Sequence, residues 1–483
     1  MYIIKMAESD MALYQQLDAL PNSLRFGAKQ LQVRIARTTN LLPIGQDSVN
    51  SNGSGVVRFR FPSASIINLS SATVSFQTTI SGLVVGSSGQ NFVNALIPAS
   101  YKYVRRAQFF LGGVSVAGSL SNNYNQIYHA MVKGAGNKQF CQSKVIEGLT
   151  EVSDLYDQYG YLNVAPAATS KVAYQQIDDF LLLAKGNGNA NEMMIDTSIW
   201  NDLELQLDFD NNSILSIYQD GTATGGSSVA WALSNMRLNV DVISSIPPIY
   251  ASFVELRASQ AAPIRLCFQN LVSQVQLAQS TTRVQVSSTC IDGLMVCGLA
   301  SNYNSTVPFT GNVAVAAVIQ ATNPPKFNFN SGLNDTTAQS GFSAIIQLGT
   351  ANYPTTAYNN AYLLADSTMN HFWHNSVAAT SLLYQKTNIV NTGTAATSVC
   401  EGDLYQAPNF LTQQFIWVQS FSIEDGWSSS QKVLSGVDTS STNVDCLVIT
   451  NGIANGSNNL LLVGLLTSVL EYDTIAKRVR VIQ

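Results

Sequence analysis

The sequence of 483 residues predicts an all-β fold built from two tandem β-sandwiches. Landmarks of the first half recur in the second half about 240 residues further along the chain. Segments that alternate apolar and polar residues occur in both halves, as expected for half-buried strands. Only 11% of the residues are charged, and polarity comes instead from Ser, Thr, Asn and Gln, which suit β surfaces and loops.

The recurring landmarks are short, so their common order and shift matter more than any single match. Each half contains a helix-like run, an Asp-Thr-Ser triplet and a final strand signal, in this order. They occupy residues 122–131, 195–198 and 236–242 in the first half, and residues 359–364, 437–440 and 469–473 in the second. Two copies of one β fold, each of domain size, explain this pattern.

Residues 1–55 are predicted to form an N-terminal arm. The segment 1–24 looks helical, because Ser9 can cap it, apolar residues follow at helical spacing and Pro21 stops it. A basic segment without any acidic residue comes next and contains Arg25, Lys29, Arg34 and Arg37. Cations grouped in this way are favoured beside the phosphates of lipid heads or of a genome. The polar residues 46–55 read as a flexible connection.

The first sandwich is predicted over residues 56–245 and the second over residues 246–483. Alternating strand patterns occupy residues 57–61, 72–76 and 203–209, and then residues 282–286, 344–348 and 415–418. Gly112-Gly113 and Asp220-Gly221 supply tight turns, and the segment Ser245-Ile246-Pro247-Pro248 marks the boundary, because two prolines end strand pairing. Units of this size, with many strands and one or two short helices in the connections, point to jelly-roll sandwiches.

The low fraction of charged residues predicts that much of the protein surface is buried against other copies of the same chain. Charged residues protect a surface against association, and protein interfaces are depleted of them. The longest apolar run, residues 460–470, is shorter than the ~18 to 20 residues of a membrane span. A monomeric β protein with an adhesive surface is the alternative reading of the composition.

The net charge and the cysteines indicate which partners and which cellular compartment the sequence favours. A net charge of −5 argues against general nucleic-acid binding by the whole chain. The six cysteines are scattered without CxxC pairs, and the start lacks a basic region followed by an apolar core. We therefore expect neither a disulfide framework nor secretion.

The sequence offers little catalytic or metal-binding chemistry. His371 and His374 have the i, i+3 spacing of a helical metal pair, but no third ligand pattern accompanies them, so no metal or cofactor is predicted. Nucleophile elbows, P-loops and dinucleotide fingerprints are absent from the sequence. The acidic pairs Glu424-Asp425 and Asp202/Glu204 could form a glycosidase dyad, although such residues are usually solvated. Core packing is the preferred explanation of the tryptophans, which are Trp200, Trp231, Trp373, Trp417 and Trp427.

The order of these landmarks resembles that of the double jelly-roll major capsid proteins of the tectivirus, adenovirus, virophage and Polinton lineage. The resemblance covers nearly the whole chain after the arm. It rests on residues 104–109, Gly112-Gly113 and the helix around Tyr124, then on residues 346–354 running into a helix over 358–373, and on residues 434–438 and 470–473.

This resemblance implies a structural virion protein without enzymatic activity, substrate or cofactor. Its subunits would form homotrimeric, pseudo-hexameric capsomers that tile an icosahedral capsid, together with penton and minor capsid proteins. The arm would then contact an internal membrane or the genome, and residues 220–228 with parts of 160–188 would form the outer towers. Another virion or appendage β protein and a carbohydrate-binding or carbohydrate-hydrolysing sandwich remain as alternatives; the latter needs exposed aromatics beside a carboxylate cleft.

Overall fold

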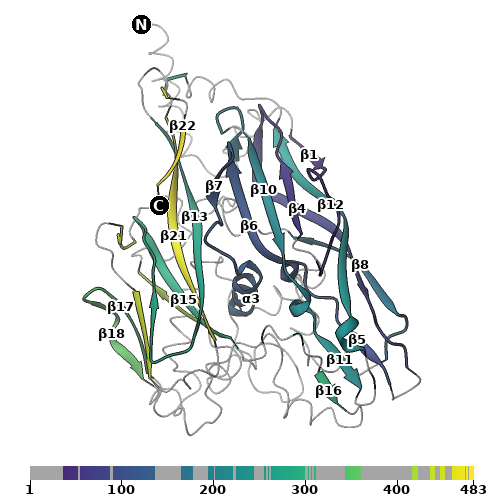
Figure 1. Ribbon diagram of the computed structural model, residues 1–483. Helices are drawn as coiled ribbons and strands as arrows, with labels where there is room; N and C mark the ends of the chain where they lie inside the picture. Colours follow the sequence, from purple (N-terminus) through teal and green to yellow (C-terminus); the bar gives the residue numbers. More distant parts are fainter. Residues whose placement is uncertain are drawn as a thin grey trace, which may run out of the picture.

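The computed structural model describes residues 36–52, 55–86, 91–135, 165–177, 194–200, 202–220, 223, 225–243, 255–256, 259, 263–299, 303, 306, 309–311, 343–359, 416–421, 436–440, 446–451, 459–473, 475–476 and 478–482. Within them the chain forms two β-sandwiches that pack side by side (Figure 1). The helix of the Tyr124 region lies between the two sandwiches.

The first sandwich consists of two sheets. Sheet A has the order β1 (Ala36–Leu41), β12 (Ala230–Ile243), β4 (Ile66–Ser81), β8 (Ser170–Ile177), with β2 (Val49–Asn50) paired to β12 and β9 (Met194–Asp196) paired to β4. Sheet B has the order β3 (Val56–Arg60), β10 (Leu203–Phe209), β6 (Val104–Leu111), β7 (Val114–Ala117).

The second sandwich also consists of two sheets. Sheet D has the order β13 (Ile264–Leu277), β21 (Asn459–Asp473), β15 (Ile291–Leu299), β19 (Ile416–Ser420), with β22 (Arg478–Ile482) paired to β21. Sheet E has the order β14 (Thr281–Val284), β20 (Cys446–Asn451), β17 (Ser343–Leu348), β18 (Ala351–Asn359).

Both sandwiches have the same topology. When the eight main strands of each are numbered along the chain, the sheet orders are 1-8-3-6 and 2-7-4-5 in the first sandwich and again in the second. This is the strand order of a jelly roll, in which two Greek keys fold into facing sheets. The chain is therefore a double jelly roll, as the landmarks predicted.

The remaining elements connect or extend the jelly rolls. A small sheet C joins β5 (Val93–Ala95), β11 (Ile217–Asp220) and β16 (Phe309–Gly311). The helices among the described residues include η1 (Ser100–Tyr103), α3 (Tyr124–Ala135), η2 (Asn212–Ile214) and η3 (Gly226–Ser228). β16 comes from the second half of the chain but pairs in parallel with β11 of the first half. The two jelly rolls are thus connected by backbone hydrogen bonds as well as by packing.

Local sequence accounts for several elements directly. The alternating segment 203–209 forms β10 with the predicted bounds. Gly112 and Gly113 have φ angles of 56° and 81° and form the turn between β6 and β7, where a two-residue hairpin favours positive φ. The helix predicted around residues 122–131 is α3. Trp200, Trp231 and Trp417 are buried, as predicted for core residues.

The predicted extent of the arm was wrong at its C-terminal end. Residues 36–41, which include Arg37, form β1, and β1 pairs with β12 along its whole length. β2 adds a second contact of the same segment to sheet A. The sequence hides β1 because it is a short edge strand whose residues Ala-Arg-Thr-Thr-Asn-Leu show no apolar alternation. Strand pairing therefore begins at Ala36 and not near Val56.

A second correction concerns the helix expected over residues 358–373. Tyr358 and Asn359 are the last residues of β18, and they pair with Ala344 and Ser343 of β17. The segment 220–228, expected as a tower loop, contains the end of β11 and the short helix η3. Residues 1–35, the Ser245–Pro248 boundary, His371, His374, Trp373, Trp427 and the Glu424-Asp425 pair lie outside the described residues.

Candidate assembly surfaces

Strand β21 of sheet D is buried on both of its faces over most of its length. In β21, Leu460, Leu462 and Leu466 face a core that is shared with sheet E. Their neighbours Leu461, Val463 and Leu465 belong to the larger core that is centred on the first jelly roll. A strand covered on both faces reads as a continuous apolar run. This burial is the reason for the apolar segment 460–470, which is a strand at the joint between the jelly rolls.

Polar contacts from the β7–α3 region of the first jelly roll cross the same joint. Nδ1 of the buried His129 in α3 lies 2.8 Å from the hydroxyl of Tyr303 in the second half, within hydrogen-bond distance. The amide of Ser273 in β13 donates to the carbonyl of Leu120 at 3.1 Å. At the far end of sheet D, the rings of Trp200 and Tyr472 meet edge to face at 5.8 Å. The surface that joins the two jelly rolls within one chain is therefore apolar at its centre and has specific polar contacts around it.

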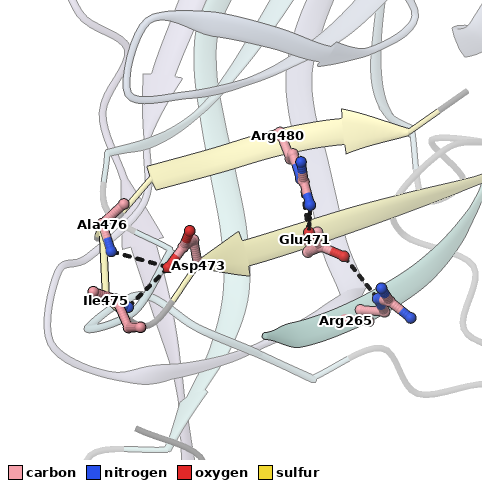
Figure 2. Close-up of polar contacts among 6 residues, drawn as sticks. All are labelled: Arg265, Glu471, Asp473, Ile475, Ala476 and Arg480. Atoms are coloured by element: carbon pink, nitrogen blue, oxygen red, sulfur yellow. Dashed lines mark hydrogen bonds and ion pairs between the residues drawn. The ribbon is translucent and has the colours of Figure 1, made fainter. Parts of the chain in front are cut away.

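An Arg-Glu-Arg ladder lies on sheet D near the C-terminal strand (Figure 2). Glu471 in β21 is in register with Arg265 of β13 on one side and Arg480 of β22 on the other. Its carboxylate accepts hydrogen bonds from Arg265 Nε and Arg480 Nε, each at 2.7 Å. The side chain of Glu471 is 2% exposed, whereas those of Arg265 and Arg480 are 63% and 70% exposed. The hydrogen bonds from Arg265 and then from Arg480 hold the pKa of Glu471 below its ordinary value.

The turn that follows β21 is held by Asp473. Its Oδ1 accepts the backbone amides of Ile475 and Ala476, each at 2.9 Å, and these bonds lower the pKa of the carboxyl (Figure 2). The turn brings β22 back along β21, so that Arg480 reaches Glu471. Sequence reasoning missed this ladder, although the alternating Arg478-Val479-Arg480-Val481 pattern was a signal for a strand with one charged face.

The outer face of sheet B carries a second charged network. Arg106 Nε donates to Asp208 Oδ2 at 2.7 Å, and Arg58 Nε donates to Gln206 Oε1 at 2.9 Å. Arg60 of the edge strand β3 pairs with Glu204 at 2.7 Å. Glu204, which the sequence left open as one half of a glycosidase dyad with Asp202, is therefore ion-paired with an arginine.

The Asp-Thr-Ser triplets of the two halves have the same structural role. In each triplet the aspartate Oδ1 accepts both the amide and the hydroxyl of the serine, at 2.9 and 2.6 Å in Asp196-Thr197-Ser198 and at 2.8 and 2.7 Å in Asp438-Thr439-Ser440. These bonds lower the pKa of Asp438, with the Ser440 hydroxyl as the main cause. The buried threonine then binds the segment that leads into the third main strand, β4 or β15.

The other site residues predicted from the sequence are not brought together here. Arg25, Lys29 and Arg34 lie outside the described residues, and Arg37 is in register with Val242 in sheet A. Among the described residues, no three His, Cys, Asp or Glu side chains form a group that could hold a metal ion. In the same part of the chain, no helix is both long and apolar enough to span a membrane.

No protein-family model and no curated protein sequence matches the chain. In contrast, solved structures match the chain. A chain of the PBCV-1 virus capsid matches with a TM-score of 0.52 at 10% identity, covering 91% of this chain and 95% of that one. A chain of the Sputnik virophage matches with a TM-score of 0.50 at 11% identity, covering 93% and 88%. The Faustovirus major capsid protein matches with a TM-score of 0.50 at 10% identity, covering 90% of each chain. The likeness spans both jelly rolls, and it shows that this chain shares the double jelly-roll fold of these viral proteins.

Proposed function

We propose that this protein is a major capsid protein, the repeated structural subunit of an icosahedral virus shell. One observation carries the proposal: two jelly rolls of identical strand order pack side by side in one chain. The solved structures with this arrangement include a PBCV-1 virus capsid and a Faustovirus major capsid protein. The proposed role is structural and uses no substrate, metal or cofactor.

The proposed assembly unit is a homotrimer with six jelly rolls around its axis. Three copies of a chain with two similar sandwiches present near-sixfold edges with threefold chemistry, which suits a hexagonally tiled shell. The charged fraction of 11% supports this role, because a subunit surrounded by copies of itself exposes little surface to solvent. In the virion the subunit would meet other trimers, penton proteins and minor capsid proteins.

The arm, now bounded as residues 1–35, is proposed as an inner tether. Its cations Arg25, Lys29 and Arg34 lie in a segment without carboxylates and suit phosphates of lipid heads or of the genome. Arg37, assigned to the same basic segment by sequence, is placed at the start of sheet A by β1. It would fix the point where the arm leaves the first jelly roll.

The mass and shape of the purified protein test this function. Light scattering after size exclusion should give three times the chain mass of 52.0 kDa, and negative-stain images should show hexagonal particles with a threefold hollow. A folded protein that stays monomeric at neutral pH under these conditions contradicts the proposal.

A further inference from the structure

We propose that the turn between β21 and β22, together with the Arg265–Glu471–Arg480 ladder beside it, binds an anionic lipid surface. This inference rests on the proposed function, in which the arm lies on the inner side of the shell, and it adds a second contact with the layer beneath. The hairpin surface, as we call it, consists of Arg265, Glu471, Asp473, Ile475, Arg478 and Arg480.

Cations are concentrated in two short segments of this acidic chain. Residues 474–483 contain Lys477, Arg478 and Arg480 and no acidic residue, although the net charge of the chain is −5. The arm shows the same pattern over residues 25–37. Grouped cations without carboxylates attract anionic surfaces, so each segment is suited to phosphates.

The fold brings the hairpin surface to the end of the molecule where β1 begins. One register row crosses sheet A from β1 through β12 and β4 to β9, and it consists of Ala36, Ile243, Ile66 and Asp196. The amide of Trp200 donates to the carbonyl of Asp196 at 2.9 Å, and the ring of Trp200 meets that of Tyr472. Tyr472 lies just before the turn into β22, and Figure 1 shows β1 and β22 in the same upper part of the view. The arm, which precedes β1, therefore starts from the same end of the molecule as the hairpin surface.

The ladder holds two arginines in place without covering them. Glu471 is buried, whereas the side chains of Arg265 and Arg480 on either side of it are mostly exposed (Figure 2). The carboxylate binds the Nε–H of Arg265 and the Nε–H and one Nη–H of Arg480, and each guanidinium has five N–H donors. The exposed remainder of each fork matches the oxygens of a phosphate. Because both groups are already ordered, binding costs less conformational entropy than it would with free side chains.

An exposed aliphatic side chain lies on the same turn. Ile475 is 71% exposed, and no other aliphatic side chain in the described part of the chain is more exposed. The turn is fixed, because Asp473 accepts the amides of Ile475 and Ala476. Glu471 is bound by its two arginines, so both carboxylates of the hairpin surface are engaged in hydrogen bonds. The exposed Arg478 follows the turn and completes a group of cations around an apolar tip.

This combination favours lipid over nucleic acid as the source of the phosphate. At a lipid interface, an aliphatic side chain enters the acyl boundary while neighbouring arginines remain among the headgroups. Arginines alone bind the phosphates of a nucleic acid as well. The exposed isoleucine among them is the feature that a lipid layer accommodates and a phosphate backbone does not. The occupant of the hairpin surface is therefore a membrane that contains anionic lipid.

Vesicle flotation tests the hairpin surface in the full-length protein. The wild type should bind vesicles of equal parts phosphatidylcholine and phosphatidylserine, should not bind phosphatidylcholine alone, and should be released by salt. Ile475→Ser/Arg478→Gln changes two exposed residues and leaves the ladder intact, and it should weaken binding about tenfold or more. The matched control is Leu277→Ser/Arg283→Gln, which makes the same chemical change at two exposed residues near the opposite end of sheet D. A tip variant that binds as tightly as the wild type, or a control that is weakened equally, overturns the proposal.

Neutralising the arm separates its contribution from that of the hairpin surface. Full-length protein with Arg25→Gln/Lys29→Gln/Arg34→Gln should retain part of the vesicle binding, and adding Ile475→Ser/Arg478→Gln should abolish the remainder. Complete loss of binding in the arm variant alone would mean that the hairpin surface does not contact lipid, and it would overturn the proposal.

Double-stranded DNA at the same phosphate concentration tests the source of the phosphate. Ile475→Ser alone should weaken binding to vesicles and leave any binding to DNA unchanged. Tighter binding to DNA than to anionic vesicles would overturn the lipid assignment. Light scattering of each protein keeps the two proposals apart. A wild type that is a folded monomer contradicts the capsid function whatever it binds, whereas a wild-type trimer that ignores anionic vesicles contradicts only the hairpin surface.

Discussion

Thr439 and Ser288 are joined by three hydrogen bonds that bind the segment before β20 to the segment before β15. The amide and hydroxyl of Thr439 donate to the carbonyl of Ser288 at 2.9 and 3.3 Å, and the amide of Ser288 donates to the Thr439 hydroxyl at 3.2 Å. Thr197 and Ser65 repeat these three bonds in the first jelly roll at 2.9, 2.9 and 3.1 Å. The Asp-Thr-Ser landmark recurs in the sequence because each jelly roll needs the same clamp.

Replacement of either threonine by valine should destabilise its jelly roll. Thr439→Val and Thr197→Val keep the side-chain volume but leave a buried amide without its hydroxyl partner, and each should cost about 1 to 3 kcal/mol in the free energy of unfolding. Denaturant unfolding measures this. The control is Thr38→Val, which removes an exposed hydrogen bond to Asp241 and should cost clearly less. Equal effects at all three positions would contradict the role of the clamp.

The Arg265–Glu471–Arg480 ladder should make stability depend on pH in acid. Because the pKa of Glu471 is lowered in the folded state, its carboxylate stabilises the fold fully above the ordinary glutamate pKa of about 4.3, and this contribution is lost as the pH falls through the lowered value. The melting temperature of the wild type should therefore be higher than that of the Glu471→Gln variant at neutral pH. This difference in melting temperature should shrink below about pH 4. Melting curves over this range provide the measurement. A difference in melting temperature that does not change with pH would show that Glu471 acts only through its shape.

Neighbouring residues of β21 should be equally sensitive to truncation. Leu461→Ala and Leu462→Ala remove side chains from opposite faces of one strand, and both faces are core, so each should cost about 2 to 5 kcal/mol. In β4, which has one open face, Val74→Ala should be costly and Ser75→Ala nearly neutral. Unfolding free energies of the four variants decide this. A nearly neutral Leu461→Ala would mean that the joint between the jelly rolls contributes little to stability.

Two truncations should distinguish the role of the N-terminal arm from the role of β1 in the first sandwich. Deletion of residues 2–34 retains β1 and should leave trimers folded while it impairs shell assembly or attachment to the interior layer. Deletion of residues 2–45 removes the six residue pairs of β1 with β12 and should lower the melting temperature of the protein. Calorimetry and electron microscopy of the assembly products distinguish the two effects. Normal assembly of the shorter truncation into intact particles would contradict the tether.

Much of the architecture could be predicted from local patterns. The alternation in residues 203–209 gives β10 because a half-exposed strand must place every second side chain in the core. Gly112-Gly113 predicts the hairpin because its turn requires positive φ. The order of the landmarks predicts two copies of one fold, and their shared topology confirms it. β1 was missed because an edge strand with one polar face and few apolar residues leaves no such pattern.

The sequence by itself determined the strands, the turns, the repeat and the scarcity of charge. Only the tertiary structure decided which strand faces are covered and which distant residues meet. Residues 460–470 are apolar because β21 is covered by sheet E on one face and by the first jelly roll on the other. Arg265 and Glu471 meet although 206 positions separate them. Strand register and the packing of one sheet on another are set by contacts between distant segments, and periodicity within a single segment carries no information about its partner. For the same reason, only the alignment of β1, β12, β4 and β9 and the contact of Trp200 with Tyr472 show that β22 begins at the end of the molecule where β1 begins.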